Sequence, residues 1–295
     1  MVYPAGKHSQ GNQTMPDNNT PSVADRVAAG FQARYAGATP TPQGIANDVL
    51  ATMLNHKTVR RYLPTALPEG TLEMLVGAAA SAPTSSNLQT WSVLAVQDKA
   101  RIAKLAELSN NQKFINTAPL FLCWLADLSR LERLGDTMGT PMEALPYLEM
   151  YQTAALDTAF AAQNVVVAAE SLGLGTCYIG GLRTSPVQVA EVLGLPRNVV
   201  AVYGLCIGYP DPAAVTEVKP RLPQSVVLHH ETYNAAQETL AVPEYDQAMV
   251  DFSKRNGMGD VDWSQRALSR AGKVGGMSGR HQMTEFLKTL GFGIK

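Results

Sequence analysis

The hydrophobic positions of this chain predict helices and strands that alternate irregularly. Short apolar runs typical of buried strands occur at Ser92–Val96, Ala118–Ala126, Thr176–Ile179 and Val199–Ile207. Helical spacing of apolar residues occurs over Ser22–Tyr35, Ile45–Met53, Lys99–Leu108, Pro146–Leu172 and Pro186–Leu193, and after Pro68, where Leu72, Leu75 and Val76 are expected to point inward. This order of elements predicts an α+β fold in which helices cover a sheet.

The long segment Pro146–Leu172 is the most apolar of the predicted helices. Its second half contains the run VVVAAESLG, so hydrophobic residues occupy most sides of the helix. A helix of this kind belongs either at the centre of a fold or in a subunit interface. The segment before it, from Met138 to Met150, is acidic and rich in methionine and has no clear period. We therefore expect irregular structure before the long helix.

The two ends of the chain differ from its middle. Residues 1–20 are polar and offer little apolar surface to offset the entropy of ordering, so they predict a flexible tail. The helix over Ser22–Tyr35 is expected to dock on the body of the protein or on a partner subunit, and residues 37–43 form a linker. We thus divide the chain into a flexible extension, 1–44, and one domain, 45–295. The last seventy or so residues predict helical fragments joined by glycine-rich turns, without a core of their own.

Composition and charge narrow the classes of function. The chain has 295 residues, of which 45% are hydrophobic, and a formal net charge of -1, which removes the broad electrostatic attraction that nucleic-acid binding needs. The three cysteines lie in apolar runs, as small core residues do, rather than in a disulfide or metal pattern. The chain shows neither an apolar signal core nor a run long enough to span a membrane. These features predict a cytoplasmic protein that acts on small molecules.

One stretch is dense in glycine, the run AAESLGLGTCYIGGLR from Ala168 to Arg183. Two interpretations are open from these residues alone. Gly180 and Gly181 can bring bare backbone against a flat ligand. Alternatively, Gly173, Gly175 and the glycine pair serve only as a helix C-cap and tight turns. The spacing is not that of a dinucleotide-binding fingerprint, because the glycines close a strand instead of opening a helix.

Two basic segments are candidates for binding an anion. HKTVRRY, from His56 to Tyr62, gathers cationic side chains after a predicted helix, and VKPRLP places Lys219 and Arg221 on either side of a proline that fixes their relative direction. A preorganised pair of cations suits a phosphate group. Each segment alone is equally well explained as a charged, solvated surface. The polar loop APTSSNLQTW, from Ala82 to Trp91, offers short hydrogen-bonding side chains. Such residues are also typical of turns that bind no ligand.

Taken together, six motifs resemble the FMN-dependent nitroreductase family, and within it the NADPH-dependent oxygen-insensitive nitroreductases and flavin reductases. They are HKTVRRY, SSNLQ, NNQK, DTAFAAQNVVVAAESLGLGTCYIGGLR, VKPRLP, and HHETY with VDWS. The resemblance runs from about Ile45 to the C-terminus. It implies a flavin reductase-like α+β fold in an intertwined homodimer, with one FMN per subunit at each dimer interface.

The resemblance also assigns residues to the cofactor. It implies that His56, Lys57, Thr58 and Arg60, with Lys219 and Arg221, hold the phosphate and ribityl chain of FMN, and Lys57 stands where arginine is more usual. Ser85, Ser86, Asn87 and Gln89 match the loop that contacts the flavin, and Asn87 departs from the bulky apolar residue of close relatives. Gln112 matches a contact to the ribityl chain or flavin edge. Ile179, Gly180 and Gly181 match the backbone near flavin N5.

For the nicotinamide cofactor the match is incomplete. In close relatives two arginines hold the 2′-phosphate of NADPH. Arg255 matches the first, with Lys254 beside it, but the second falls in NGMGDVDW, where glycine or aspartate stands. Since a lost contact weakens binding, the preference for NADPH is expected to be relaxed towards NADH. Arg280 matches a basic residue near the substrate mouth.

The function that the resemblance implies is transfer of hydride from NAD(P)H through FMN to nitroaromatic, quinone or flavin acceptors by a ping-pong mechanism. Because the flavin carries the chemistry, no catalytic side chain and no metal is expected. Two alternatives stay open, a flavoprotein of the same fold with different substrate chemistry and a non-enzymatic flavin-binding module.

Overall fold

A computed structural model describes residues 21–214 and 217–295 and shows an antiparallel sheet of four strands. The strand order is β1 (Trp91–Val96), β2 (Leu120–Asp127), β4 (Val199–Gly208) and β3 (Gly175–Ile179). The two central strands are the most apolar, and every residue of β2 is buried. Apolar runs without alternation are expected where both faces of a sheet are covered. The predicted strands are therefore confirmed.

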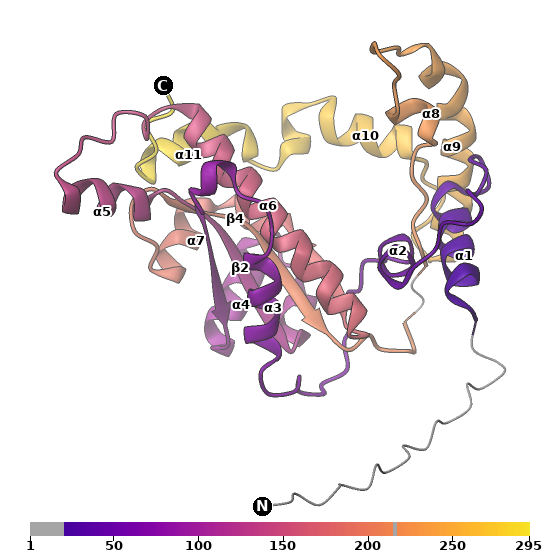
Figure 1. The fold of residues 1–295 in the computed structure, drawn as a ribbon, viewed down its shortest axis with the longest axis horizontal. Helices are drawn as coiled ribbons and strands as arrows, with labels where there is room; N and C mark the ends of the chain where they lie inside the picture. Colours follow the sequence, from indigo (N-terminus) through magenta and orange to yellow (C-terminus); the bar gives the residue numbers. More distant parts are fainter. Residues whose placement is uncertain (1–20, 215–216) are drawn as a thin grey trace, which may run out of the picture.

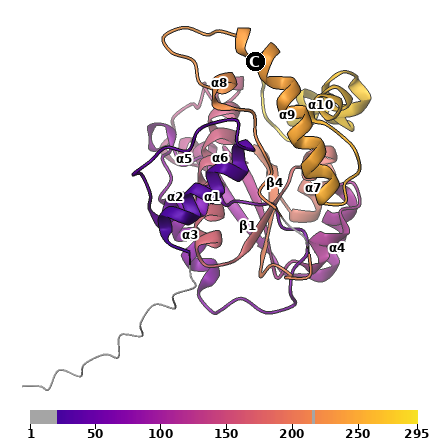
Figure 2. The ribbon, with the colours of Figure 1, turned by 90° about the vertical axis from the view of Figure 1, so that its right-hand side faces the viewer.

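Helices cover both faces of this sheet. On one face lie α3 (Thr71–Ala80) and the long helix α6 (Leu148–Ser171), whose buried alanines and valines pack against Trp124 and Leu205. On the other face lie α4 (Lys99–Leu108) and α7 (Pro186–Leu193), packed around Phe121 and Ile179. Figure 2 shows the two layers on either side of the strands. The α+β fold predicted from the sequence is thus confirmed, with α6 at the centre of the fold.

The remaining helices lie at the two ends of the sheet. At one end are α1 (Val23–Tyr35), α2 (Asp48–Leu54), α8 (Gln224–Val227) and α9 (Ala236–Arg255), and at the other α5 (Ser129–Met138) and α11 (Met283–Thr289) (Figure 1). Between them runs α10 (Trp263–Ala271), which packs on α9. The C-terminal segment therefore connects both ends of the molecule.

The N-terminal helix is present where the sequence predicts it. Ser22 caps α1 through a reciprocal capping box with Asp25, and α1 packs on α2. Residues 1–20, predicted to be a flexible tail, lie outside the described residues. Residues 21–44 thus contain a packed helix, and the division of the chain at residue 44 stays a prediction.

The structure adds to or corrects the sequence analysis at three helices. Residues 129–138 form the helix α5, which was not predicted from the sequence. The segment α9 has a small cluster of its own, in which Tyr245, Met249 and Phe252 are buried, although no core was expected there. The helix predicted over Ile45–Met53 is α2, and its apolar side chains Val49 and Met53 are exposed in the single chain.

All three cysteines are buried in the sheet. Cys123, Cys177 and Cys206 are free thiols, and burial raises the pKa of each of them, that of Cys123 to about 12. The expectation that they are core residues is confirmed. Within residues 21–214 and 217–295, no helix has both the length and the apolar character required to cross a bilayer.

Candidate functional site

The basic segment after α2 runs as extended chain beside β3. Thr58 forms a bridge with Thr176, and the Val59 amide donates to the Thr176 carbonyl at 2.9 Å. Val59 is buried against Gly175, where a Cβ atom would lie only 2.5 Å from the Val59 side chain. This close approach explains the glycine at the start of β3. The pairing fixes the segment on the edge of the sheet.

His56 is oriented by a carboxylate from the end of α6. Its Nδ1 lies 2.7 Å from Oε1 of Glu170, and the Thr176 hydroxyl donates to the same oxygen at 2.8 Å. A ligand that met this histidine would therefore meet its Nε2 edge. Glu170 was not singled out in the sequence, where it is an isolated acid in an apolar helix.

A cavity of about 200 Å³ brings several predicted phosphate ligands together. Thr58, Arg60 and Lys219 line it, and the Lys219 ammonium lies 5.5 Å from the centre of the Phe252 ring. Burial, followed by the charges of Arg266, Arg60 and Arg221, lowers the pKa of Lys219. Positive charge is therefore concentrated here before any anion binds, as a site for a phosphate group requires.

Two predicted phosphate ligands occupy different surroundings. Lys57 lines another cavity, of about 340 Å³, together with Gly175 and Pro210, so the structure does not bring it to Arg60 and Lys219. Arg221 is exposed, and its Nη1 donates to the carbonyls of Lys219 and Pro220, each at 3.2 Å. The roles of Lys57 and Arg221 toward FMN stay predictions.

The glycine pair after β3 lies beside Gln112. A Cβ atom on Gly181 would lie 2.6 Å from the Gln112 Nε2 and 2.8 Å from the carbonyl oxygen of Ser109, so only glycine fits. The Gln112 amide donates to that same carbonyl at 2.8 Å. At Gly180 the corresponding position meets only the tip of Arg183, at 3.4 Å. The structure thus joins Gln112 to the turn formed by Ile179, Gly180 and Gly181.

The polar loop before β1 is held by a buried carboxylate on α6. The Thr84 hydroxyl and the Ser85 amide both donate to Asp157, which is only 1% exposed. The loop needs such support, because Ser86, Asn87 and Gln89 all have positive φ angles, of 48, 53 and 51°. These angles are unfavourable for residues other than glycine. Asp157 therefore stabilises a strained loop.

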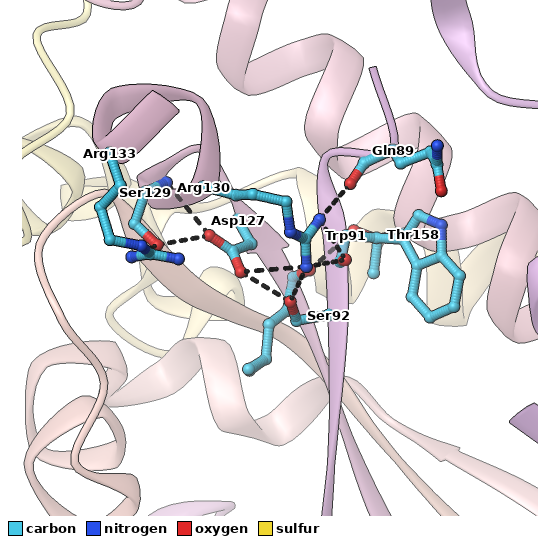
Figure 3. A network of polar contacts seen from close by, with 9 residues as sticks. Gln89, Trp91, Ser92, Asp127, Ser129, Arg130, Arg133 and Thr158 are labelled. Atoms are coloured by element: carbon cyan, nitrogen blue, oxygen red, sulfur yellow. Dashed lines mark hydrogen bonds and ion pairs between the residues drawn. The ribbon is translucent and has the colours of Figure 1, made fainter. Parts of the chain in front are cut away.

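A second carboxylate supports the other end of this loop (Figure 3). Asp127 accepts hydrogen bonds from the hydroxyls of Ser92 and Ser129, and Arg130 reaches from it to the carbonyl of Gln89. Burial alone would raise the pKa of Asp127, but the hydrogen bonds from Ser129 and Ser92 and the charge of Arg130 outweigh it and lower the pKa. Asp127 therefore stays ionised and keeps Arg130 on the loop.

The loop and the phosphate cations lie at different positions along α6. Asp157, which holds the loop, and Glu170, which holds His56, are thirteen residues apart on this helix. At 1.5 Å per residue this separation is about 20 Å. One chain therefore contains two separate groups of predicted FMN ligands. The first is the phosphate cluster, which consists of His56, Arg60 and Lys219, and the second is the loop.

The predicted nicotinamide residues are ion-paired within the chain. Nε of Arg255 lies 3.1 Å from Oε2 of Glu217, and the ammonium of Lys254 lies 3.3 Å from Oδ2 of Asp260. Arg280 lies instead beside the glycine turn, since its Nη2 is 3.4 Å from the Thr184 hydroxyl. Burial and then the charges of Arg270 and Arg183 lower the pKa of Arg280. Their roles toward NADPH and substrate stay predictions.

Comparison with known proteins agrees with this arrangement. Residues 53–209 match the Nitroreductase family, and residues 219–295 match the C-terminal domain of that family. The chain is 36% identical over 228 residues to the FMN reductase (NADPH) of Bacillus subtilis (strain 168), with 76% of this chain and 91% of that protein covered. It is 34% identical over 200 residues to the oxygen-insensitive NADPH nitroreductase of Salmonella typhimurium, with 68% and 80% covered.

A solved structure extends the similarity to the whole fold. The NADPH:FMN oxidoreductase from Vibrio harveyi, complexed with NAD+, superposes with a TM-score of 0.74 at 31% identity, and the match covers 84% of this chain and all of that one. The sequence motifs, the fold and the comparisons agree. The chain belongs to the nitroreductase family.

Proposed function

We propose that this protein is an FMN-dependent oxidoreductase that transfers hydride from NAD(P)H to nitroaromatic, quinone or flavin acceptors by a ping-pong mechanism. The observation that carries the proposal is the cationic cavity at Lys219, which lies in a family fold whose relatives are named FMN and nitro reductases. FMN, when bound, supplies the hydride chemistry. The protein therefore needs to bind and orient FMN, not to provide a nucleophile or base.

The described residues fit FMN at both of its ends. A phosphate dianion would relieve the repulsion between Lys219 and its neighbouring arginines, and Arg60 and Thr58 line the same cavity. At the glycine turn, Gly181 is packed against Gln112 and Ser109, whereas Gly180 meets only the tip of Arg183, so a flat ring system could approach the backbone at Gly180. These residues would bind and position FMN.

We also infer a homodimer in which the loop of one subunit lies close to the phosphate cluster of the other. The support is the separation of about 20 Å along α6 between the two groups of predicted ligands. Large apolar side chains exposed on the single chain agree with this arrangement. They include Val49, Met53, Leu156, Phe160 and Tyr178. Light scattering on the purified protein tests the inference, and a monomer that retains stoichiometric FMN would contradict it.

The function is tested on purified protein. We expect a yellow protein with one FMN per chain that oxidises NADPH only when a nitroaromatic, a quinone or free flavin is added. Protein that binds no FMN on titration would contradict the proposal. Yellow protein that turns over NADPH poorly with every acceptor would favour the alternative, a flavoprotein of the same fold with other substrate chemistry.

Glu217 is expected to reduce the preference for NADPH. It pairs with Arg255, so a 2′-phosphate must compete with a carboxylate already in place. We predict that Glu217→Gln lowers the KM for NADPH by about threefold to tenfold and leaves the KM for NADH within about twofold. Steady-state rates with both nucleotides at low salt check this.

A matched control is available in the same region. Glu244 lines the cavity between α1 and α9 that Glu217 and Arg255 also line, but it is not the ion-pair partner of Arg255. Glu244→Gln should therefore leave the ratio of the two KM values unchanged. Equal shifts for NADPH and NADH in Glu217→Gln would show that Arg255 does not read the 2′-phosphate.

A further inference from the structure

The last turn of α1 contacts both segments that carry the predicted phosphate ligands. This helix lies outside the residues that match the nitroreductase family, 53–209 and 219–295. Its Arg34 is buried, with 9% exposure, and donates from Nη1 to the Lys219 carbonyl at 2.9 Å and from Nη2 to the His56 carbonyl at 2.8 Å. The Arg221 amide in turn donates to the Arg34 carbonyl at 2.8 Å.

These contacts join two parts of the chain that are distant in sequence. His56 begins the basic segment beside β3, and Lys219 is the second residue of the rigid VKPRLP segment. A guanidinium group is planar and presents its donors in a fixed fork, so it sets the spacing between the two carbonyls more sharply than a flexible ammonium can. Arg34 also donates to the Leu54 carbonyl at 3.1 Å, at the end of α2.

The contacts of Arg34 do not neutralise its charge. All three acceptors are backbone carbonyls, and burial, followed by the charge of Arg221, lowers the pKa of Arg34 against the smaller opposing effects of Tyr35 and Glu170. Such a buried cation retains most of its attraction for an anion nearby, because little water screens it. Arg34 therefore fixes the spacing of the two segments and adds positive charge near the phosphate cluster.

We propose that α1 is a built-in clamp of the cofactor site, in which Arg34 is a positioning residue that holds the His56 and Lys219 segments at the spacing required by the FMN phosphate. The inference rests on the proposed function. It assigns a role in cofactor affinity to the helix that precedes the family-matched residues. The clamp acts on the phosphate and not on the flavin ring, and this difference makes it testable.

The experiment measures dissociation constants of FMN and of riboflavin, which lacks the phosphate, on apoprotein freed of flavin. For Arg34→Met we expect FMN affinity to fall by about tenfold or more and riboflavin affinity to change by less than about twofold. Arg34→Lys keeps the charge but lacks the fork, so it should lose about threefold to tenfold for FMN alone. Circular dichroism and thermal melting establish that each variant is folded.

Arg26→Met is the matched control on the same helix. Arg26 forms an exposed ion pair with Asp48 of α2 at 2.7 Å, so its replacement removes a cation from α1 and leaves the contacts of Arg34 in place. FMN affinity should stay within about twofold of the wild type.

If the ratio of the FMN and riboflavin dissociation constants in Arg34→Met equals that of the wild type, the inference is overturned. This holds whether both affinities are unchanged or both fall equally. If Arg34→Met does not fold, Arg34→Lys decides by the same ratio. Wild-type protein that binds neither ligand would instead refute the proposed function.

Discussion

Lys219→Met is expected to weaken FMN binding by about 10-fold to 150-fold, since one charge-assisted hydrogen bond contributes about 1.5–3 kcal/mol. The apoprotein of this variant should be at least as stable as the wild type. Lys219 is half-buried among Arg266, Arg60 and Arg221, and its lowered pKa shows that its positive charge destabilises the ligand-free site. The substitution removes that repulsion, at the cost of the contact between the Lys219 ammonium and the Phe252 ring.

The stability difference has a defined dependence on pH. The folded state holds the Lys219 proton less tightly than the unfolded state, whose pKa is near 10.5. Between the lowered pKa and 10.5 the unfolded state binds more protons, so wild-type stability rises with pH and the penalty of the buried charge disappears. The advantage of Lys219→Met in urea unfolding should therefore shrink as the pH approaches 10.5.

Lys104→Met provides the control for the loss of a lysine. It lies on α4, exposed and paired with Glu107 at 2.9 Å, and does not line the cavity at Lys219. Its FMN affinity and apoprotein stability should match the wild type. If Lys219→Met retains full FMN affinity, Lys219 does not bind the FMN phosphate.

Asp157→Asn is expected to destabilise the protein by about 2–3 kcal/mol and to lower its Tm by about 5 °C or more. The Thr84 hydroxyl and the Ser85 amide both donate to this carboxylate, so an amide group would place one donor against another in a buried site. The loop would then lose the support that holds its positive φ angles.

Thermal unfolding of the apoprotein measures the effect without any contribution from FMN. Asp136→Asn is the control, because Asp136 is exposed near the end of α5 and its replacement should change the Tm by less than about 2 °C. If Asp157→Asn melts with the wild type, the carboxylate does not hold the loop. In the proposed dimer the same variant would also bind FMN less tightly.

The strands and most of the helices could be predicted because the sheet is buried on both faces. The run from Leu120 to Ala126 has no polar residue and is unambiguous. By contrast, α5 was missed, since it is mostly polar and its N-cap, Leu128, provides no side-chain cap. The outward face of α2 was not foreseen either, because periodicity shows that positions share a face but not what covers it.

The cations of the candidate site could be found as local clusters, whereas the residues that orient them could not. Glu170 and Asp157 are single acids in an apolar helix, and a lone buried acid of this kind is a usable signal for a long-range partner. Arg34 gave no such signal, because its partners are carbonyls of distant segments. Hydrogen bonds to backbone leave no pattern in the side chains of the sequence.

The buried thiols have a consequence for tolerance to the proposed quinone acceptors. Quinones are electrophiles that alkylate thiolates, and a protein that reduces them meets them at every turnover. Cys123, Cys177 and Cys206 are shielded in the sheet, and burial raises the pKa of each above its ordinary value, so they are rarely ionised and out of reach. The same packing that completes the core would thus protect the enzyme from covalent inactivation by its own substrates.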